Sequence, residues 1–239
     1  MGLMKTYLPI WSDPRILWHI CDGDYAALAA ALDEATAYER AGVDRVLAII
    51  SDLAELGIRP PARVLDVGCN TGLFSLTLGL LGYRVVGVDD NMAAQAQGWY
   101  PEPPLLLARQ SCEQLGLTHV SFMEADVATV VRQSAEPFDI CLLLSVTHQW
   151  FQGYASTPLG AKTEADITAT LRNIANATRA VLYFEGPEHE VDASKVTLPL
   201  PDWFLQQGLF AFVRPLSISA TALGDLRQLY RLTRDTTSS

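Results

Sequence analysis

The sequence predicts an α/β protein built on a doubly wound, mostly parallel sheet, and two observations support this class. First, short apolar runs resemble strands that are buried on both faces. These runs occupy residues 64–67, 84–88, 138–144 and 180–185. Second, the first run enters a turn bounded by Gly68 and Gly72, and an apolar segment at 73–81 predicts a helix directly after it. A strand, a glycine turn and a helix in succession form the first half of a nucleotide-binding unit.

Composition limits the kinds of protein that this chain can be. Its 239 residues suit one α/β domain, and 49% hydrophobic residues are enough to fill a large core. We expect no membrane span and no secretory signal, because the sequence lacks both a run of roughly 18–20 apolar residues and a basic leader. A net charge of -10 makes a nucleic-acid partner unlikely. The cysteines lack paired spacing, which predicts reduced thiols and a cytoplasmic location. They are Cys21, Cys69, Cys112 and Cys141.

The glycine turn predicts the type of ligand. A dinucleotide-binding turn has the spacing Gly-x-Gly-x-x-Gly, whereas Gly68 and Gly72 are separated by three residues. Asp66 precedes the first glycine by two positions. A carboxylate there repels a diphosphate and attracts a cation. S-adenosylmethionine, which carries an ammonium and a sulfonium group but no phosphate, therefore fits better than a dinucleotide, and a dehydrogenase is disfavoured.

The stretch 64–73 resembles motif I of the class I S-adenosylmethionine-dependent methyltransferases. The resemblance implies that Asp66 lies near the methionine amino group. It also implies that the loop backbone surrounds the methionine portion of the cofactor. The loop positions concerned are Gly68, Cys69, Asn70 and Gly72. The alternative is an ordinary glycine turn capped by an aspartate.

Acidic residues after the next two predicted strands extend this resemblance. Asp89 follows the strand at 84–88, where an acid is expected to accept hydrogen bonds from two ribose hydroxyls. Asp90 is an additional acid at the same place. In the resembled family, an acid at the position of Asp126 binds the adenine amino group, and the next amide, that of Val127, meets a ring nitrogen. Asp126 could instead cap a short helix.

The resemblance implies a seven-stranded Rossmann-like methyltransferase fold that ends in an antiparallel hairpin. The last two strands are expected at 210–218 and 227–232, too close together for a crossover helix. We predict a single methyltransferase domain over 1–239, with an N-terminal helical extension or lid at 1–38 and a catalytic core at 39–235. A helical pattern at 25–56 precedes the first strand, and its Arg40 is either a partner for the methionine carboxylate or a surface residue.

The best catalytic candidates follow the fourth and fifth strands, because α/β sheets bind ligands at the carboxyl ends of their strands. His148 is the first candidate for a general base, and Glu185 and His189 are second choices. Ser145, at the end of the fourth strand, is assigned to the cofactor site. His148 could instead cap the following helix, and the other two could be surface residues. Three aromatic residues could form a wall for the acceptor: Tyr25, Trp150 and Tyr154.

The sequence restricts the class of methyl acceptor only through the motifs that it lacks. The fourth strand is not followed by Asn-Pro-Pro-Tyr or Asp-Pro-Pro-Tyr, which accompany methylation of adenine or glutamine nitrogen. The sequence also lacks the Pro-Cys dipeptide of cytosine methylation and a metal-binding constellation. The predicted function is methyl transfer to an oxygen or nitrogen of a small molecule, with specialised metabolism as the expected setting. The alternatives are a tRNA or protein methyltransferase and a non-catalytic S-adenosylmethionine-binding module.

Overall fold

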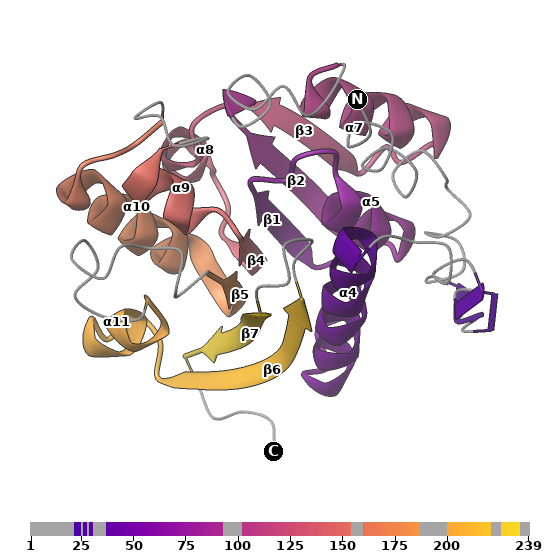
Figure 1. Cartoon of the computed structure of the whole chain (residues 1–239). Helices are drawn as coiled ribbons and strands as arrows, with labels where there is room; N and C mark the ends of the chain where they lie inside the picture. Colours follow the sequence, from indigo (N-terminus) through magenta and orange to yellow (C-terminus); the bar gives the residue numbers. More distant parts are fainter. Residues whose placement is uncertain are drawn as a thin grey trace.

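The computed structural model describes residues 22–24, 26–27, 29–30, 37–92, 102–153, 160–186, 200–220 and 226–234. Most of the predicted extension at 1–38 lies outside these residues, so its role stays a prediction. The described parts form one sheet between two layers of helices (Figure 1). Among the described helices, none is both long enough and apolar enough to cross a membrane.

The described strands form a seven-stranded sheet in the order β3-β2-β1-β4-β5-β7-β6. Their bounds are β1 Arg63–Val67, β2 Arg84–Asp89, β3 Val120–Glu124, β4 Phe138–Leu144, β5 Thr178–Glu185, β6 Phe212–Ala220 and β7 Leu226–Thr233. Strands β1 to β5 pair in parallel, whereas β7 is antiparallel to both β5 and β6. The predicted methyltransferase-type sheet with its antiparallel hairpin is thereby confirmed.

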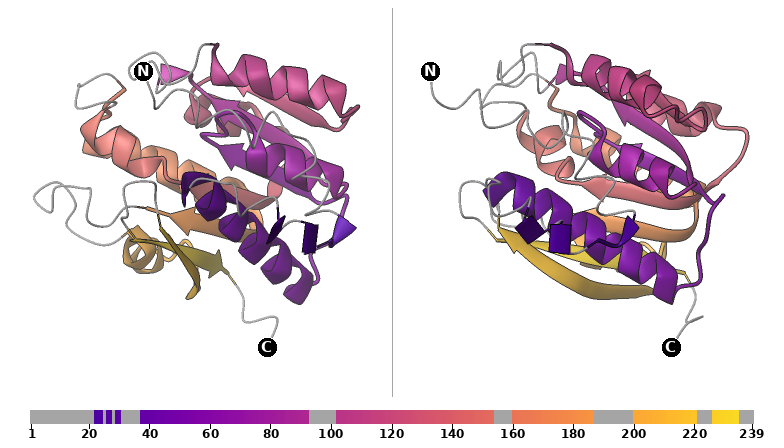
Figure 2. Two further views of the ribbon diagram at one scale, coloured as in Figure 1. Left: turned by 45° about the vertical axis from the view of Figure 1, so that its right-hand side comes forward. Right: turned by 90° about the vertical axis from the view of Figure 1, so that its right-hand side faces the viewer.

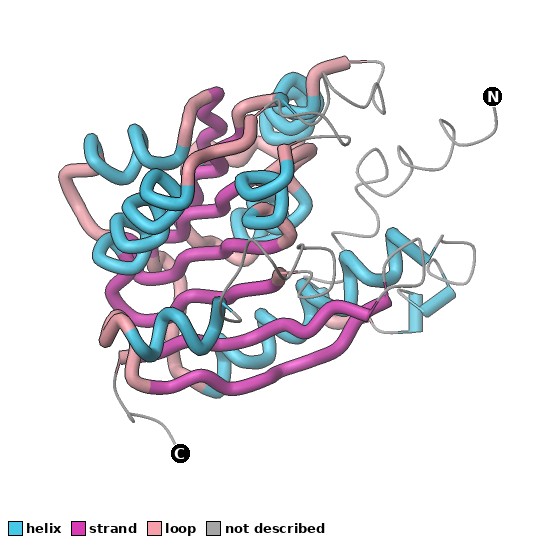
Figure 3. The backbone as a smooth tube through the Cα atoms, turned by 60° about the vertical axis from the view of Figure 1, so that its left-hand side comes forward, coloured by secondary structure: helices cyan, strands magenta, loops and turns pink. Residues whose placement is uncertain are grey.

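Each face of the sheet carries its own layer of helices (Figures 2 and 3). One face packs against α4 Ala37–Glu55, α5 Leu73–Leu80 and α7 Pro104–Gln114. The other packs against α8 Val127–Gln133, α9 Thr147–Gln152, α10 Glu164–Ala177 and α11 Leu200–Gln206. Side chains alternate along a strand, so β4 supplies Ile140 and Leu142 to the first layer and Cys141 and Leu143 to the second. This explains why the 138–144 run is almost wholly apolar.

Local signals in the sequence fix where several helices end. α4 begins at Ala37 and stops at Glu55, before Gly57, whose φ of 68° is the left-handed conformation of a helix C-cap. The predicted start at residue 25 lies outside the described residues, which before 37 are only 22–24, 26–27 and 29–30. α10 begins after Thr163, whose hydroxyl accepts a hydrogen bond from the amide of Asp166 at 3.2 Å, as the predicted cap requires.

A buried polar contact holds α4 against the sheet. Asp52 is 4% exposed and accepts hydrogen bonds from the Tyr183 hydroxyl at 2.8 Å and from Nη1 of Arg231 at 2.9 Å. Burial raises the pKa of the Tyr183 hydroxyl well above its usual value, and the negative charge of Asp52 raises it further. The phenol therefore stays protonated and donates its hydrogen to the carboxylate. This contact joins α4 to β5 and β7.

Replacement of Asp52 should destabilise the protein strongly. In Asp52→Ala, the Arg231 side chain, 11% exposed, loses its carboxylate partner. We expect the free energy of unfolding to fall by about 3–5 kcal/mol in urea titrations, as for other broken buried ion pairs. Asp44→Ala, at an exposed position of the same helix, is the matched control and should change stability by less than about 0.5 kcal/mol. Equal effects of the two variants would contradict the importance of the buried contact.

Candidate active site

A cavity of about 250 Å³ opens at the carboxyl edge of the sheet, beside the ends of β1, β2 and β4 and the turn after β3. Every predicted cofactor residue except Gly72 lines it. These residues are Asp66, Gly68, Cys69, Asn70, Asp89, Asp90, Asp126, Val127 and Ser145. Residues from four separate segments of the sequence thus surround one space, as the parallel order of the strands requires.

The loop between β1 and α5 can take this form only with glycine at both ends. Gly68 has a φ of 68°, and a Cβ there would lie 2.4 Å from Cγ2 of Val146. Gly72 has a φ of 87°, and its Cβ would lie 2.9 Å from Cζ of Phe122. Both positions are therefore strained for any larger residue. Gly72 contributes by letting α5 start close to the sheet, not by lining the cavity.

Asp66 is a buried acid in the wall of the cavity. Its Oδ2 accepts a hydrogen bond from the Ser75 hydroxyl, on α5, at 2.6 Å. Burial raises the pKa of the Asp66 carboxyl to about 6, the bonds to Ser75 oppose this rise, and the charge of Asp89 adds to it. A buried carboxylate of this kind is stabilised by a cation placed against it, which suits the ammonium group expected from the sequence.

Asp89 connects the first two loops of the site. Its Oδ2 accepts a hydrogen bond from the amide of Asn70 at 2.9 Å, and its Oδ1 accepts one from the amide of Asn91 at 2.7 Å. Burial raises the pKa of this carboxyl, while the two amide bonds act to lower it. A carboxylate has about four acceptor positions, so these bonds leave capacity for ribose hydroxyls. The sequence predicted the ribose role but not the link between loops.

Asp126 performs the capping role that the sequence left as an alternative. Its Oδ1 accepts a hydrogen bond from the amide of Ala128 at 2.8 Å, which starts α8. Its Oδ2 forms an ion pair with Nζ of Lys162. Partial burial acts to raise the pKa of the Asp126 carboxyl, but the contacts with Lys162 and Ala128 outweigh it, so the pKa is lowered. The carboxylate still lines the cavity, where it can meet an adenine amino group.

The family model of a methyltransferase domain matches residues 65–180, from β1 into β5. The matched stretch carries the glycine loop, Asp89, Asp126 and the end of β4. The chain contains a class I S-adenosylmethionine-dependent methyltransferase domain. S-adenosylmethionine is the cofactor of this domain class, and the residues present fit it. The carboxylates of Asp66 and Asp89 line the space where its ammonium and hydroxyl groups would bind, and the same carboxylates would repel the phosphates of a dinucleotide.

Solved structures support the fold of this methyltransferase domain. The bifunctional kinase-methyltransferase WbdD aligns over 80% of this chain with 24% identity and a TM-score of 0.59. The magnesium protoporphyrin IX methyltransferase ChlM from Synechocystis PCC 6803, crystallised with bound SAM, aligns over 82% with 19% identity and a TM-score of 0.58. The alignment covers 81% of the ChlM chain but only 39% of the WbdD chain. No curated protein sequence matches this chain.

The structure describes two of the three predicted catalytic residues of the methyltransferase domain, His148 and Glu185. His148 lies in the first turn of α9, half-buried, and lines the cavity. Glu185 ends β5 with a fully buried side chain, and its Oε2 lies 2.9 Å from Nη1 of Arg45. His189 lies outside the described residues. Of the predicted aromatic wall, Trp150 lines the cavity, whereas Tyr25 and Tyr154 also lie outside the described residues.

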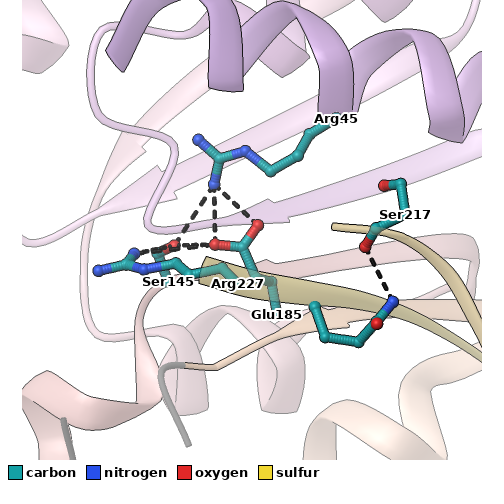
Figure 4. A network of polar contacts seen from close by, with 6 residues as sticks. Arg45, Ser145, Glu185, Ser217 and Arg227 are labelled. Carbon is teal, nitrogen blue, oxygen red and sulfur yellow. Dashed lines mark hydrogen bonds and ion pairs between the residues drawn. The ribbon is translucent and has the colours of Figure 1, made fainter. Parts of the chain in front are cut away.

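Two charged residues that line the cavity escaped the sequence analysis, Arg45 on α4 and Arg227 on β7. Both contact Ser145, at the end of β4, through Nη1 (Figure 4). Arg45 is 100 residues away from Ser145 in the sequence, so no local sequence pattern predicts their contact. The sequence analysis considered Arg40 on the same helix, five positions earlier, whose side chain is not among those described.

The raised pKa of Asp66 predicts that its negative charge lowers the stability of the ligand-free protein and strengthens cofactor binding. The folded-state pKa of about 6 exceeds the ordinary value of 3.8, so the ligand-free folded protein binds the extra proton. The free energy of unfolding should therefore fall as the pH rises from about 4 to about 6, by about 3 kcal/mol in total. Asp66→Asn removes this contribution, so its urea midpoint should fall less than the wild-type midpoint over that window and should exceed the wild-type midpoint at pH 7.5.

The same Asp66→Asn variant should bind S-adenosylmethionine more weakly at pH 7.5, because the charge that attracts the ammonium group is gone. Isothermal titration measures this loss, which we expect to be at least about fivefold. A variant that is neither more stable nor weaker in binding would show that Asp66 does not carry a buried charge facing the cofactor.

Proposed function

We propose that this protein transfers a methyl group from S-adenosylmethionine to an oxygen or nitrogen of a small molecule, with a specialised metabolite as the expected acceptor. The observation that carries this proposal is the arrangement around one cavity. Residues after β1, β2 and β3 form the expected cofactor side, and Ser145 and His148 follow β4 beside them. Cofactor and acceptor can therefore meet at the end of β4, which is where the methyl group is expected.

The protein has little covalent chemistry to perform in this reaction. When bound, S-adenosylmethionine supplies an already activated methyl group. The chain's own residues must hold the acceptor in line with it and accept a proton where the acceptor is a hydroxyl or a protonated amine. His148 is our candidate for the proton acceptor, because it lines the cavity at the start of α9. Glu185 is buried in an ion pair and suits a positioning role better.

Charge and cysteine chemistry support the finer parts of the proposal. A net charge of -10 disfavours tRNA, whose phosphates the protein would repel. The described cysteines are free and buried, which fits the cytoplasmic location that we propose. They are Cys69, Cys112 and Cys141.

Cofactor binding tests the first half of the proposal. In Asp89→Ala, the ribose hydroxyls lose a partly buried acceptor, and the loop bond to Asn70 is lost as well. We expect the dissociation constant of S-adenosylhomocysteine, measured by isothermal titration, to rise by about 5- to 150-fold, equivalent to roughly 1–3 kcal/mol. Asp44→Ala, which removes an exposed acid of α4, should leave it unchanged. A wild-type protein without affinity for the cofactor would reject the proposal.

Methyl transfer tests the second half. With radiolabelled S-adenosylmethionine and a pool of small metabolites, wild type should release labelled methyl product. His148→Ala should lower kcat by about 10²- to 10⁴-fold if the imidazole accepts the proton, and S-adenosylhomocysteine should bind as before. His119→Gln, at the amino-terminal end of β3 away from the cavity, is the matched control and should retain activity. Undiminished turnover in His148→Ala would remove this residue from the mechanism.

A further inference from the structure

The charged residues that line the cavity are divided by sign. The acids lie at or just beyond the carboxyl ends of the first three strands and belong to the expected cofactor side: Asp66, Asp89, Asp90 and Asp126. The arginines, Arg45 and Arg227, come from α4 and β7 and meet at the end of β4. In the sheet order, β4, β5 and β7 lie on the side of β1 away from β2 and β3. The two arginines therefore lie on the other side of the site from these acids, and both contact Ser145, the one predicted cofactor residue that follows β4.

A network of short contacts joins these arginines (Figure 4). Nη1 of Arg45 lies 3.0 Å from Oε1 and 2.9 Å from Oε2 of Glu185. Nη1 of Arg227 donates to Oγ of Ser145 at 2.6 Å and lies 3.7 Å from Oε1 of Glu185. The Ser145 hydroxyl in turn donates to Oε1 of Glu185 at 2.6 Å. Helix α4, strands β5 and β7 and the residue directly after β4 thus contribute to a single cluster.

The backbone conformation of Ser145 and the burial of Glu185 both hold the cluster in place. Ser145 has a φ of 55°, which is uncommon for a residue with a side chain, and its amide donates to the Glu185 carbonyl at 2.8 Å. The Glu185 side chain is fully buried, whereas Arg45 and Arg227 remain 12% and 16% exposed. The carboxylate therefore sits beneath the arginines and restricts their positions, while both arginines line the cavity.

We propose that Arg227 and Arg45 bind an anionic group on the methyl acceptor, either a carboxylate or a phosphate ester. Both guanidinium groups line the cavity beside the end of β4, and guanidinium groups match carboxylate and phosphate oxygens in geometry and charge. Glu185 and Ser145 are positioning residues that hold the two side chains in place. This inference rests on the proposed methyltransferase function and names the class of its acceptor.

A rival role for the same arginines is contact with the carboxylate of the cofactor's methionine. Arg45 is nearer to the glycine loop, because its guanidinium lies 5.8 Å from the ring centre of Phe74 on α5. Arg227 lies on β7, beyond β5 from the cofactor strands. The position of Arg227 therefore separates the two roles, and the experiment is built on this residue.

The test uses the full-length protein saturated with S-adenosylhomocysteine and three phenyl compounds as acceptor fragments. Benzoate carries a carboxylate, phenyl phosphate a phosphate ester, and phenol no charge at neutral pH. Isothermal titration should show that at least one of the two anions binds wild type at least about tenfold more tightly than phenol. A preference for benzoate indicates a carboxylate acceptor, and a preference for phenyl phosphate indicates a phosphate ester.

Arg227→Gln should weaken binding of the preferred anion at least about tenfold and leave phenol and S-adenosylhomocysteine unaffected. Arg227→Lys, which keeps the charge without the planar fork, should lose less. Arg214→Gln is the matched control, since it removes an arginine of the same hairpin that is 53% exposed and pairs with Glu55. Thermal unfolding of each variant in the presence of S-adenosylhomocysteine confirms that the tested protein is folded.

Several results would overturn the inference. Wild type that binds neither anion better than phenol contradicts it, as does an equal loss in Arg214→Gln and Arg227→Gln. A loss of S-adenosylhomocysteine affinity in Arg227→Gln as large as the loss for the anion assigns the arginines to the cofactor instead. Failure of the proposed function would give a different result. Wild type would then have no affinity for S-adenosylhomocysteine but would still bind the anion through Arg227.

Discussion

The carboxylates of Asp66, which is buried, and Asp89, which is half-buried, line the cavity beside the glycine loop, and neutral groups hold them there. Asp66 accepts a hydrogen bond from Ser75, and Asp89 accepts bonds from the amides of Asn70 and Asn91. Burial raises the pKa of both acids. The charges of these two carboxylates therefore destabilise the ligand-free protein, and a ligand with a cationic group and hydroxyl groups would stabilise them. Acids with pKa values perturbed in this way are common at functional sites.

These bonds also shape the site. Asp89 ties the loop after β1 to the loop after β2, so the expected ribose acceptor is also a structural connection. Gly68 and Gly72 allow the loop to pass close to Val146 and Phe122, whose side chains would clash with any Cβ there. The binding groups of the cofactor side are thus positioned by hydrogen bonds to the same loop backbone that they hold in place.

The opposite side of the cavity depends on contacts between distant segments. Helix α4 carries Asp52, which fastens the helix to Tyr183 and Arg231, and two turns earlier it carries Arg45, which reaches Glu185. The packing of one helix therefore also fixes a guanidinium in the cavity wall. In the proposed mechanism, the two sides of the site have different functions, because the acids face the cationic cofactor and the arginines face the acceptor.

The sequence by itself determined the order of strands and helices, the turn at Gly68 and Gly72, and the acids at the ends of β1 and β2. Those features follow from local chemistry: the apolar period of a strand, the backbone freedom of glycine and the edge at which parallel strands end. Only the tertiary structure decided that Glu185 is buried in an ion pair and that Arg45 and Arg227 meet at Ser145. Arg45 and Glu185 are 140 residues apart, and a contact over that distance depends on how the sheet and α4 pack together.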